Sequence, residues 1–277
     1  MVSAFQKPVI MGIINLSPDS FYQASPNFVD ALKKAEAMVM QGAAMIDVGA
    51  VATNPNINLH FETPSVQQEL DAVLPFIEAL SKSVDVMISV DTSRAAVMDA
   101  SIKAGAHMIN DQRSLMEENA LETAIKLNVP VCLMHHFNPA RQPGSSACAE
   151  LLTQIKHDLQ NNIARCMAAG IAHENIIIDP GFGGGNFGKS ADENFYVLAH
   201  LNTLVDLSLP ILVGLSRKSF FGELLKADIE ERLYASIAGA VIAAEQGAAI
   251  LRVHDVKATL DAMSVLQKVQ DLRNEIA

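Results

Sequence analysis

Polar and charged residues lie in, or end, eight short apolar runs of this chain. The carboxylates among them accept hydrogen bonds, the side-chain amides both give and accept them, and the arginine and lysine side chains supply cationic donors for an anion. These residues are Asn15, Asp47, Asp91, Asn110, Asp111, His135, His136, Asp179, Ser216, Arg217, Lys218, Arg252, His254 and Asp255. If the runs are parallel strands, their polar ends meet at one edge of the sheet and form an active site there.

Helical patterns separate the apolar runs, so strand and helix alternate eight times. Gly42, Gly105 and Gly247 each stand between a helical pattern and the next strand, as a repeated turn would require. No Ser/Gly-rich or Pro-rich linker divides the chain. The pattern predicts an α/β protein with one domain over residues 1–277, a (β/α)8 TIM barrel with its active site at the C-terminal ends of the strands. The helical patterns cover residues 27–41, 65–82, 93–104, 117–127, 149–169, 191–206, 230–246 and 255–273.

The composition excludes several classes of partner. The 277 residues carry a formal net charge of −11, which argues against nucleic acid or an anionic membrane as the main partner. No apolar run is long enough to span a membrane, and the first residues lack the apolar region of a secretory signal. Cys132, Cys148 and Cys166 are odd in number and lack metal-type spacing. We therefore expect a cytoplasmic protein with reduced cysteines.

Four segments together resemble dihydropteroate synthase, the folate-pathway enzyme family that sulfonamides inhibit. They are NLSPDSF at 15–21, DTSRAAVMDASIKAGAHMIND at 91–111, IIIDPGFG at 176–183, and VGLSRKSFFG at 213–222 followed by LRVHDV at 251–256. The resemblance implies a barrel that joins a pterin carrying a methylene pyrophosphate to p-aminobenzoate, with release of pyrophosphate. It also implies bound Mg²⁺ and a homodimer.

The resemblance assigns a role to each matching residue. Asn15 is matched to the magnesium and pyrophosphate site, Ser219 to the p-aminobenzoate carboxylate, and Thr53 to a loop beside the substrates. The pterin is matched to Asp91, Asn110, Asp179 and Lys218, and the pyrophosphate to Arg252 and His254. Of these, Lys218, Arg252 and Asp91 are the predicted catalytic residues.

The chemistry of these side chains agrees with the assigned roles. Carboxylates can accept two hydrogen bonds from the amidine-like edge of a pterin, an amide suits its lactam edge, and a guanidinium suits a leaving pyrophosphate. Magnesium prefers oxygen ligands and keeps waters, so Asn15 and substrate oxygens would suffice. A helix predicted to begin near Ser219 favours a carboxylate. The hypothesis for the mechanism is dissociative, without a protein nucleophile.

The chain departs from the usual family pattern in four loops. Gln23 replaces an acidic residue, Asn54 stands where an arginine is usual, the loop at 180–190 is longer, and MHHF follows the fifth strand. These departures leave open a pterin-binding paralog with another second substrate or without synthase activity. A methyltetrahydrofolate-dependent methyltransferase, which also uses a pterin-binding barrel, is a further alternative.

Several polar residues also have purely structural interpretations. The segment 183–190 matches a P-loop pattern, but its context favours a Gly-rich lid with a solvated Lys189. Asp47 could anchor backbone, and we expect Asp111 and Asp255 to cap the helices that follow them. Arg217 should point opposite to its two neighbours, as a substrate contact or a support. His135 and His136 are adjacent in a strand and face opposite ways, so they cannot easily share a zinc; we expect one side chain in the pocket and the other in the packing.

Overall fold

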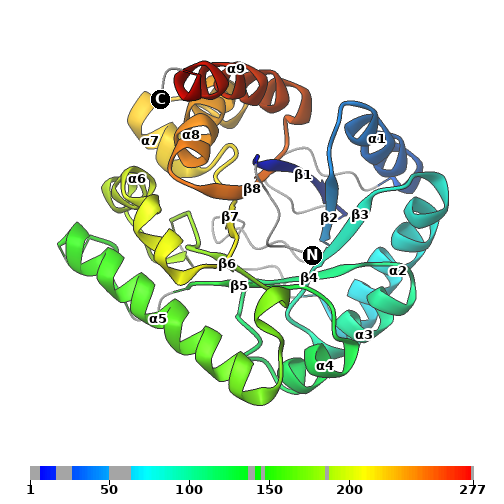
Figure 1. Cartoon of the computed structure of the whole chain (residues 1–277). Helices are drawn as coiled ribbons and strands as arrows, with labels where there is room; N and C mark the ends of the chain where they lie inside the picture. Colours follow the sequence, from blue (N-terminus) through cyan, green and yellow to red (C-terminus); the bar gives the residue numbers. More distant parts are fainter. Residues whose placement is uncertain are drawn as a thin grey trace.

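Eight parallel strands close into a barrel in the computed structural model (Figure 1), which describes residues 7–16, 27–49, 64–136, 141–144, 147–184 and 187–275. Each strand pairs with the next along the chain, and the eighth pairs with the first. This confirms the predicted (β/α)8 barrel. The strands are β1 (Val9–Asn15), β2 (Met45–Gly49), β3 (Met87–Asp91), β4 (Met108–Asp111), β5 (Val131–Met134), β6 (Ile176–Asp179), β7 (Ile211–Val213) and β8 (Ala248–Val253).

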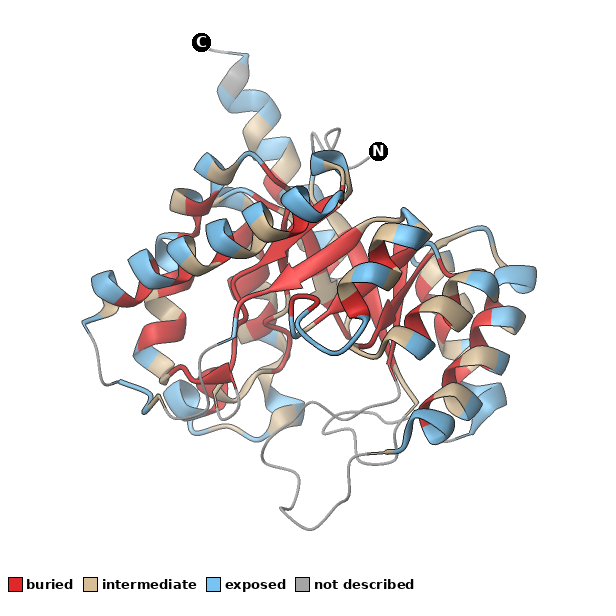
Figure 2. Cartoon of the chain, turned by 90° about the horizontal axis from the view of Figure 1, so that it is seen from below, coloured by how far each residue is buried: buried red, intermediate tan, exposed pale blue. Residues whose placement is uncertain are grey.

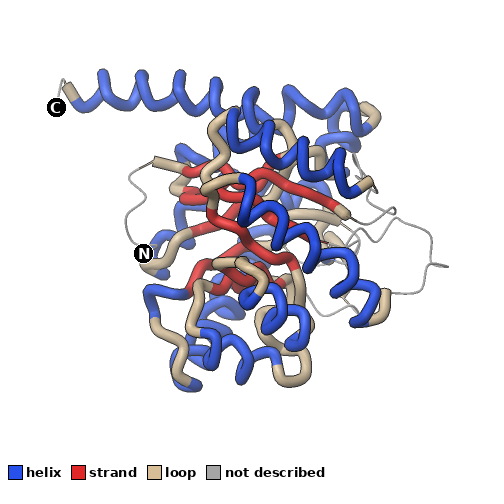
Figure 3. The backbone as a smooth tube through the Cα atoms, turned by 90° about the vertical axis from the view of Figure 1, so that its right-hand side faces the viewer, coloured by secondary structure: helices blue, strands red, loops and turns tan. Residues whose placement is uncertain are grey.

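Helices surround the barrel and turn their apolar sides toward it, while their outer sides are exposed (Figure 2). The α-helices of the described residues are α1 (Phe28–Met40), α2 (Val66–Ser83), α3 (Ala95–Lys103), α4 (Ala120–Leu127), α5 (Cys148–Ala169), α6 (Ala191–Ala199), α7 (Ser219–Leu225), α8 (Leu233–Glu245) and α9 (Val256–Asn274). The C-terminal end of α9 reaches past the barrel (Figure 3). None of the helices that can be described is long and apolar enough to cross a membrane.

Local sequence explains where several helices begin and end. Ser65 and Ser190 form capping boxes at the starts of α2 and α6, each satisfying exposed backbone N–H groups. Gly42, Gly105 and Gly247 have φ angles of +104°, +114° and +97°, a left-handed conformation that ends a helix at little cost only for glycine. The repeated glycine turns are therefore confirmed. The segment after β7 forms α7 at Ser219 in addition to the predicted helix at 230–246.

The barrel interior has an apolar lower part and a polar upper part. Its lower layer packs Met11, Met45, Met108, Cys132, Ile177, Leu212 and Ile250. Because side chains alternate along a strand, the next inward positions toward the C-terminal ends come two residues later. They include Asp47, Ser89, Asn110, Asp179 and Arg252. The alternation therefore places acids, an amide and a guanidinium together above an apolar floor.

Candidate active site

Arg252 lies at the centre of the polar layer and binds two carboxylates. Its Nε donates to Asp47 Oδ2 at 2.6 Å, and its Nη2 donates to Asp91 Oδ2 at 2.8 Å. Asn110 Nδ2 donates to the same Asp47 oxygen at 3.1 Å. Asp47 has no exposed side-chain surface and Asp91 has 9%. Residues from β2, β3, β4 and β8 thus form one buried network at the mouth of the barrel.

Burial and the neighbouring charges shift the pKa values of the residues in this network. Burial raises the pKa of Asp91 to about 7, although Arg252 opposes the shift and Asp47 adds to it. Burial alone would lower the pKa of Arg252, but Asp47 and Asp91 outweigh it and raise that pKa above its ordinary value. Arg252 therefore remains a cation, whereas Asp91 gains or loses a proton near neutral pH.

Asp179 and Lys218 form a second polar group beside this network. Asp179 Oδ1 accepts a hydrogen bond from the Gly181 N–H at 2.7 Å. Burial raises the pKa of Asp179 to about 6, while this N–H and the charge of Lys218 act against the shift. Burial lowers the pKa of Lys218 to about 8, and Arg252 also lowers it. Lys218 Nζ lies 4.1 Å from the ring centre of Phe187, so a cation and an aromatic face adjoin the buried acids.

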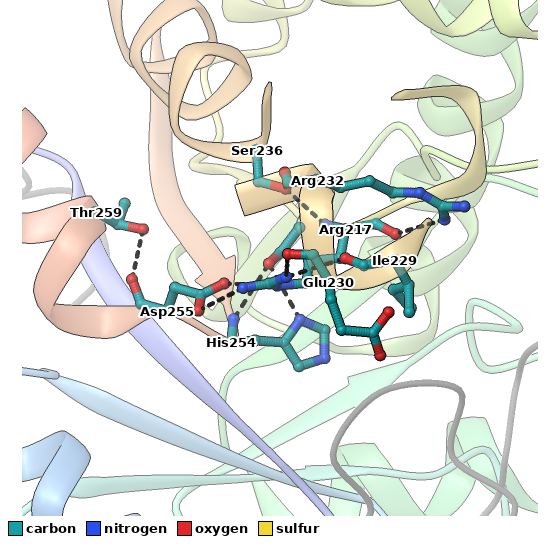
Figure 4. A network of polar contacts seen from close by, with 9 residues as sticks. Arg217, Ile229, Glu230, Arg232, Ser236, His254, Asp255 and Thr259 are labelled. Carbon is teal, nitrogen blue, oxygen red and sulfur yellow. Dashed lines mark hydrogen bonds and ion pairs between the residues drawn. The ribbon is translucent and has the colours of Figure 1, made fainter. Parts of the chain in front are cut away.

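The turn after β7 is fixed by an outward-facing ion pair (Figure 4). Arg217 has a φ of +57°, and its Nε and Nη2 each donate to an Asp255 oxygen at 2.9 Å. Its Nη1 donates to the carbonyl oxygens of Ile229 and Glu230 at 3.0 and 2.8 Å. Arg217 is therefore a support for the turn. Asp255 occupies the N-cap position of α9, as expected, but its carboxylate binds Arg217 and makes no capping hydrogen bond.

Inward-facing residues of the same two segments also contact each other. Ser216 Oγ lies 3.1 Å from His254 Nδ1 and accepts from the His254 backbone N–H at 3.3 Å. Burial lowers the pKa of His254 well below its ordinary value, and nearby cations such as Arg252 lower it further. The imidazole is therefore neutral at physiological pH and keeps one N–H donor. The segments SRKS and RVHD are held together on both sides of the strand ends.

The loop between β6 and α6 is packed rather than solvated. Lys189 is only 2% exposed, and its Nζ donates to the Gly181 carbonyl oxygen at 2.7 Å. Burial lowers the pKa of Lys189 to about 7, against the opposing charge of Asp179. Gly183 N–H donates to Asn194 Oδ1 at 2.7 Å, which ties the loop to α6. The expected solvated lysine is therefore wrong, and Lys189 binds its own loop instead of presenting its amine as a P-loop lysine does.

Other polar residues at the strand ends have structural partners. His135 is buried, with Nε2 3.2 Å from Asp158 Oδ2 of α5, while His136 is exposed. One side chain of the pair is therefore packed, as expected, and the other is exposed. Asp111 accepts from the N–H groups of Arg113 and Leu115 at 2.8 and 2.7 Å. It thus holds the turn after β4, whereas Asn119 occupies the N-cap of α4, so the expected helix cap at Asp111 is wrong.

Asn15 is the predicted magnesium ligand, and its position fits a site that the substrate helps to form. It ends β1 opposite Gly49 of β2 and is partly exposed at an inward position of the barrel. Within the described ranges, no group of three or more His, Cys, Asp or Glu side chains could hold a metal ion. An amide oxygen at this position suits magnesium that is carried by a phosphate-bearing substrate and water, rather than a cage built by the protein alone.

The structure gathers most of the predicted residues at the C-terminal mouth of the barrel. Asp91 and Asp179 interact electrostatically with both Arg252 and Lys218, although they come from separate strands. Ser219 begins α7, directly after Lys218, as predicted. The mouth also includes Asn15, Asn110 and His254. Thr53, Gln23 and Asn54 lie outside the residues that the structure describes.

Two contributors were missed from the sequence. Gln112 donates from Nε2 to both oxygens of Asp91 at 2.9 Å, and Phe187 lies beneath the amine of Lys218. Gln112 follows the polar end of β4 directly, so its position was a usable signal. Phe187 carries no such signal, because only folding brings its loop to the turn after β7.

Comparisons with known proteins agree with the geometry. Residues 11–254 match the family model described as "Pterin binding enzyme". Dihydropteroate synthase of Escherichia coli K12 is 45% identical over 263 residues, which are 94% of this chain and 91% of that protein. The protein of Haemophilus influenzae with the same name is 44% identical over 94% of this chain and 93% of its own length.

Solved structures show the same relationship in three dimensions. A dihydropteroate synthase of Coxiella burnetii in complex with pteroic acid has a TM-score of 0.89 and 46% identity, covering 95% of this chain and 93% of that chain. The Yersinia pestis dihydropteroate synthase with a sulfonamide drug complex has a TM-score of 0.90 and 45% identity, covering 97% and 96%. The chain belongs to the pterin-binding enzymes, and within them to the dihydropteroate synthase family.

Proposed function

We propose that this protein is a dihydropteroate synthase, a transferase of folate biosynthesis. It condenses 6-hydroxymethyl-7,8-dihydropterin pyrophosphate with p-aminobenzoate to give 7,8-dihydropteroate and pyrophosphate. The single observation that carries the proposal is the shared mouth of the barrel, where buried acids adjoin Lys218 and Arg252. The 45% identity to a dihydropteroate synthase over 94% of the chain supports the same reaction.

The pterin would bind to the buried polar side chains of the mouth. Asp91 and Asp179 present carboxylates to the donor edge of the ring, and Asn110 presents an amide that can give and accept a hydrogen bond. Lys218 supplies a further donor next to the ring of Phe187. Each acid accepts hydrogen bonds through both oxygens only after it has lost its proton. Because the pKa values are about 7 for Asp91 and about 6 for Asp179, this happens near neutral pH.

The reaction would proceed through departure of pyrophosphate before attack by the amine. No protein nucleophile is required, so the protein contributes positioning and charge stabilisation. Arg252 remains a cation because of its two carboxylate partners. Those carboxylates bind Nε and Nη2 of Arg252. Nη1 and the neutral His254 would then donate to the pyrophosphate.

Magnesium would be held by the oxygen of Asn15 together with substrate oxygens and water. Its partly exposed position at the end of β1 supports this assignment. When bound, the ion neutralises negative charge on the pyrophosphate. Ser219, the first residue of α7, would donate its hydroxyl to the carboxylate of p-aminobenzoate.

The protein would form a homodimer through its outer helices. Helices α8 and α9 pack against each other and leave apolar side chains exposed, with Tyr234 at 81% and Val265 at 67%. The sequence LYASIAGAVIAAE makes α8 apolar nearly all round, which is typical of a helix buried on two sides.

The free cysteines at positions 132, 148 and 166 suit the cytoplasm.

The test is to mix the pterin pyrophosphate, p-aminobenzoate and Mg²⁺ with the protein and to measure both products. Equal amounts of pyrophosphate and dihydropteroate are expected. Pyrophosphate release without dihydropteroate when p-aminobenzoate is present at saturating concentration would indicate a paralog with another second substrate. Pterin binding without either product would indicate a binding-only paralog, and methyl transfer from methyltetrahydrofolate would indicate the methyltransferase alternative.

A further inference from the structure

We propose that Gln112 is an affinity-setting residue of the pterin pocket, whose amide occupies Asp91 in the free protein and is displaced when the heterocycle binds. The proposal rests on the function proposed above, because it takes Asp91 to be an acceptor for the pterin. It goes further by assigning a competitor for that acceptor within the chain itself.

The contact is specific in geometry. Gln112 Nε2 lies 2.9 Å from Oδ1 and 2.9 Å from Oδ2 of Asp91, so one amide nitrogen faces both carboxylate oxygens. Arg252 Nη2 donates to Oδ2 at 2.8 Å. The two side chains approach Asp91 from different strands, since Gln112 directly follows β4 and Arg252 lies in β8.

These contacts compete with a ligand for the acceptor positions of the Asp91 carboxylate. An ionised carboxylate offers about four lone-pair positions. Arg252 uses one of them and Gln112 uses one on each oxygen. Only about one position remains, whereas a heterocycle edge with two parallel N–H groups needs two. Recognition of both N–H groups by Asp91 therefore requires Gln112 to release at least one oxygen.

The backbone beside Gln112 allows its side chain to move alone. Asp111 holds the following turn through the N–H groups of Arg113 and Leu115 and through Ser93 Oγ at 2.5 Å. Leu115 has a φ of +57°, a conformation that this hydrogen-bonded turn fixes. Gln112 is only partly buried, so rotation about its side-chain bonds can withdraw the amide while the turn stays in place.

Gln112 stabilises the ionised form of Asp91 among the charges that surround it. Arg252 faces Asp91 from β8 and Lys218 from the turn before α7, while Asp47 and Asp111 face it from β2 and β4. Hydrogen bonds from Gln112 favour the ionised carboxylate over the neutral acid. The amide thus keeps the acceptor ionised before binding, at the cost of contacts that the ligand must replace.

The experiment compares binding of 6-hydroxymethylpterin, which lacks the leaving pyrophosphate, to the wild type and to Gln112→Leu. At about pH 8.5, where Asp91 is ionised, the variant should bind about tenfold more tightly, because no charged hydrogen bond must be broken first. Gln112→Asn, whose shorter side chain draws the amide back, should also bind more tightly and carries the test if the leucine variant does not fold. Isothermal titration calorimetry gives the dissociation constants.

Gln67→Leu is the matched control, since Gln67 Nε2 donates to Asp71 Oδ1 at 2.7 Å on the exposed surface of α2. Its pterin affinity should equal that of the wild type. Unchanged or weaker binding by both folded Gln112 variants would overturn the inference. Wild-type protein that binds no pterin would instead overturn the proposed function, so the two failures are distinguishable. In an Asp91→Asn background, the effect of Gln112→Leu should disappear.

Discussion

Asp47→Ala removes the buried carboxylate that supports both Arg252 and Asn110. One oxygen of Asp47 accepts from the guanidinium at 2.6 Å and from the amide at 3.1 Å. In the alanine variant, Arg252 keeps only Asp91 as its carboxylate partner within the network, and the amide loses its acceptor. Asp47→Asn is the matched variant, because its amide oxygen can still accept both hydrogen bonds while the negative charge is gone.

The structure allows the loss of stability to be approximated for each variant. Removal of one partner from a buried ion pair costs about 3–5 kcal/mol, and an amide left without its acceptor adds about 1 kcal/mol. Arg252 is 18% exposed, so water can partly replace the missing carboxylate and the lower end applies. We expect about 4 kcal/mol for alanine and about 1 kcal/mol for asparagine. At about 2–4 °C for each kcal/mol, alanine should lower the melting temperature by roughly 8–16 °C.

A second readout separates electrostatics from general destabilisation. Asp47 is one of the charges that raise the pKa of Asp91, so both variants should lower that pKa and move the acid limb of pterin binding to lower pH. Thermal unfolding and pterin titrations across pH measure the two effects. An alanine variant that melts with the wild type and keeps the same acid limb would refute the role of Asp47 in this network.

Three further predictions follow from the site. Pterin affinity should rise between about pH 5 and pH 8, because burial raises the pKa of Asp179 to about 6 and of Asp91 to about 7, and each carboxylate accepts through both oxygens only after it has lost its proton. Folding stability should change in the opposite direction: because these pKa values lie above the ordinary value of 3.8, the stability that the two groups provide is full below about pH 4 and is lost as the pH rises to about 7. A pterin titration at constant ionic strength that gives a flat profile would contradict the rise in affinity. Lys218→Ala and Asp91→Asn should each lower turnover about tenfold or more, since each removes a directional contact; steady-state product formation measures this, and near-normal turnover in both would rule out the pocket assignment. Arg217→Met should destabilise the protein by about 3 kcal/mol, and Arg217→Met with Asp255→Asn should cost less than the sum of the single changes because the two side chains bind each other; additive melting-temperature shifts would contradict the pairing.

The fold and the location of the site could be predicted because their signals are local. Apolar runs bounded by glycine turns are a property of consecutive residues, and parallel closure then follows from their regular alternation with helices. The start of α7 at Ser219 was predicted in the same way, from its position after a strand. Arg217 was expected to point away from its neighbours by strand alternation, but β7 ends at Val213 and a turn with a φ of +57° at Arg217 directs its side chain to Asp255 instead.

The partners of the charged residues could not be predicted, because they depend on tertiary contacts. Lys189 lies in a Gly-rich segment that suggests a solvated loop, yet its amine binds the Gly181 carbonyl in the interior. Asp255 precedes a helix as a capping residue would, but the guanidinium of Arg217 binds it instead. Asp47 binds a residue that lies far along the chain on β8. In each case an ion pair or hydrogen bond that forms only in the folded protein replaced the locally favoured role.

Side chains from separate strands form one pocket for a flat heterocycle, and a calorimetric titration of 6-hydroxymethylpterin tests this directly. The proteins compared are the wild type, Asp179→Asn and the control Asp206→Asn, whose carboxylate lies on the surface with 72% exposure. We expect one-site binding by the wild type and the control, and binding at least about tenfold weaker by Asp179→Asn. Equal affinity in all three proteins, or a wild type that binds no pterin, would contradict it.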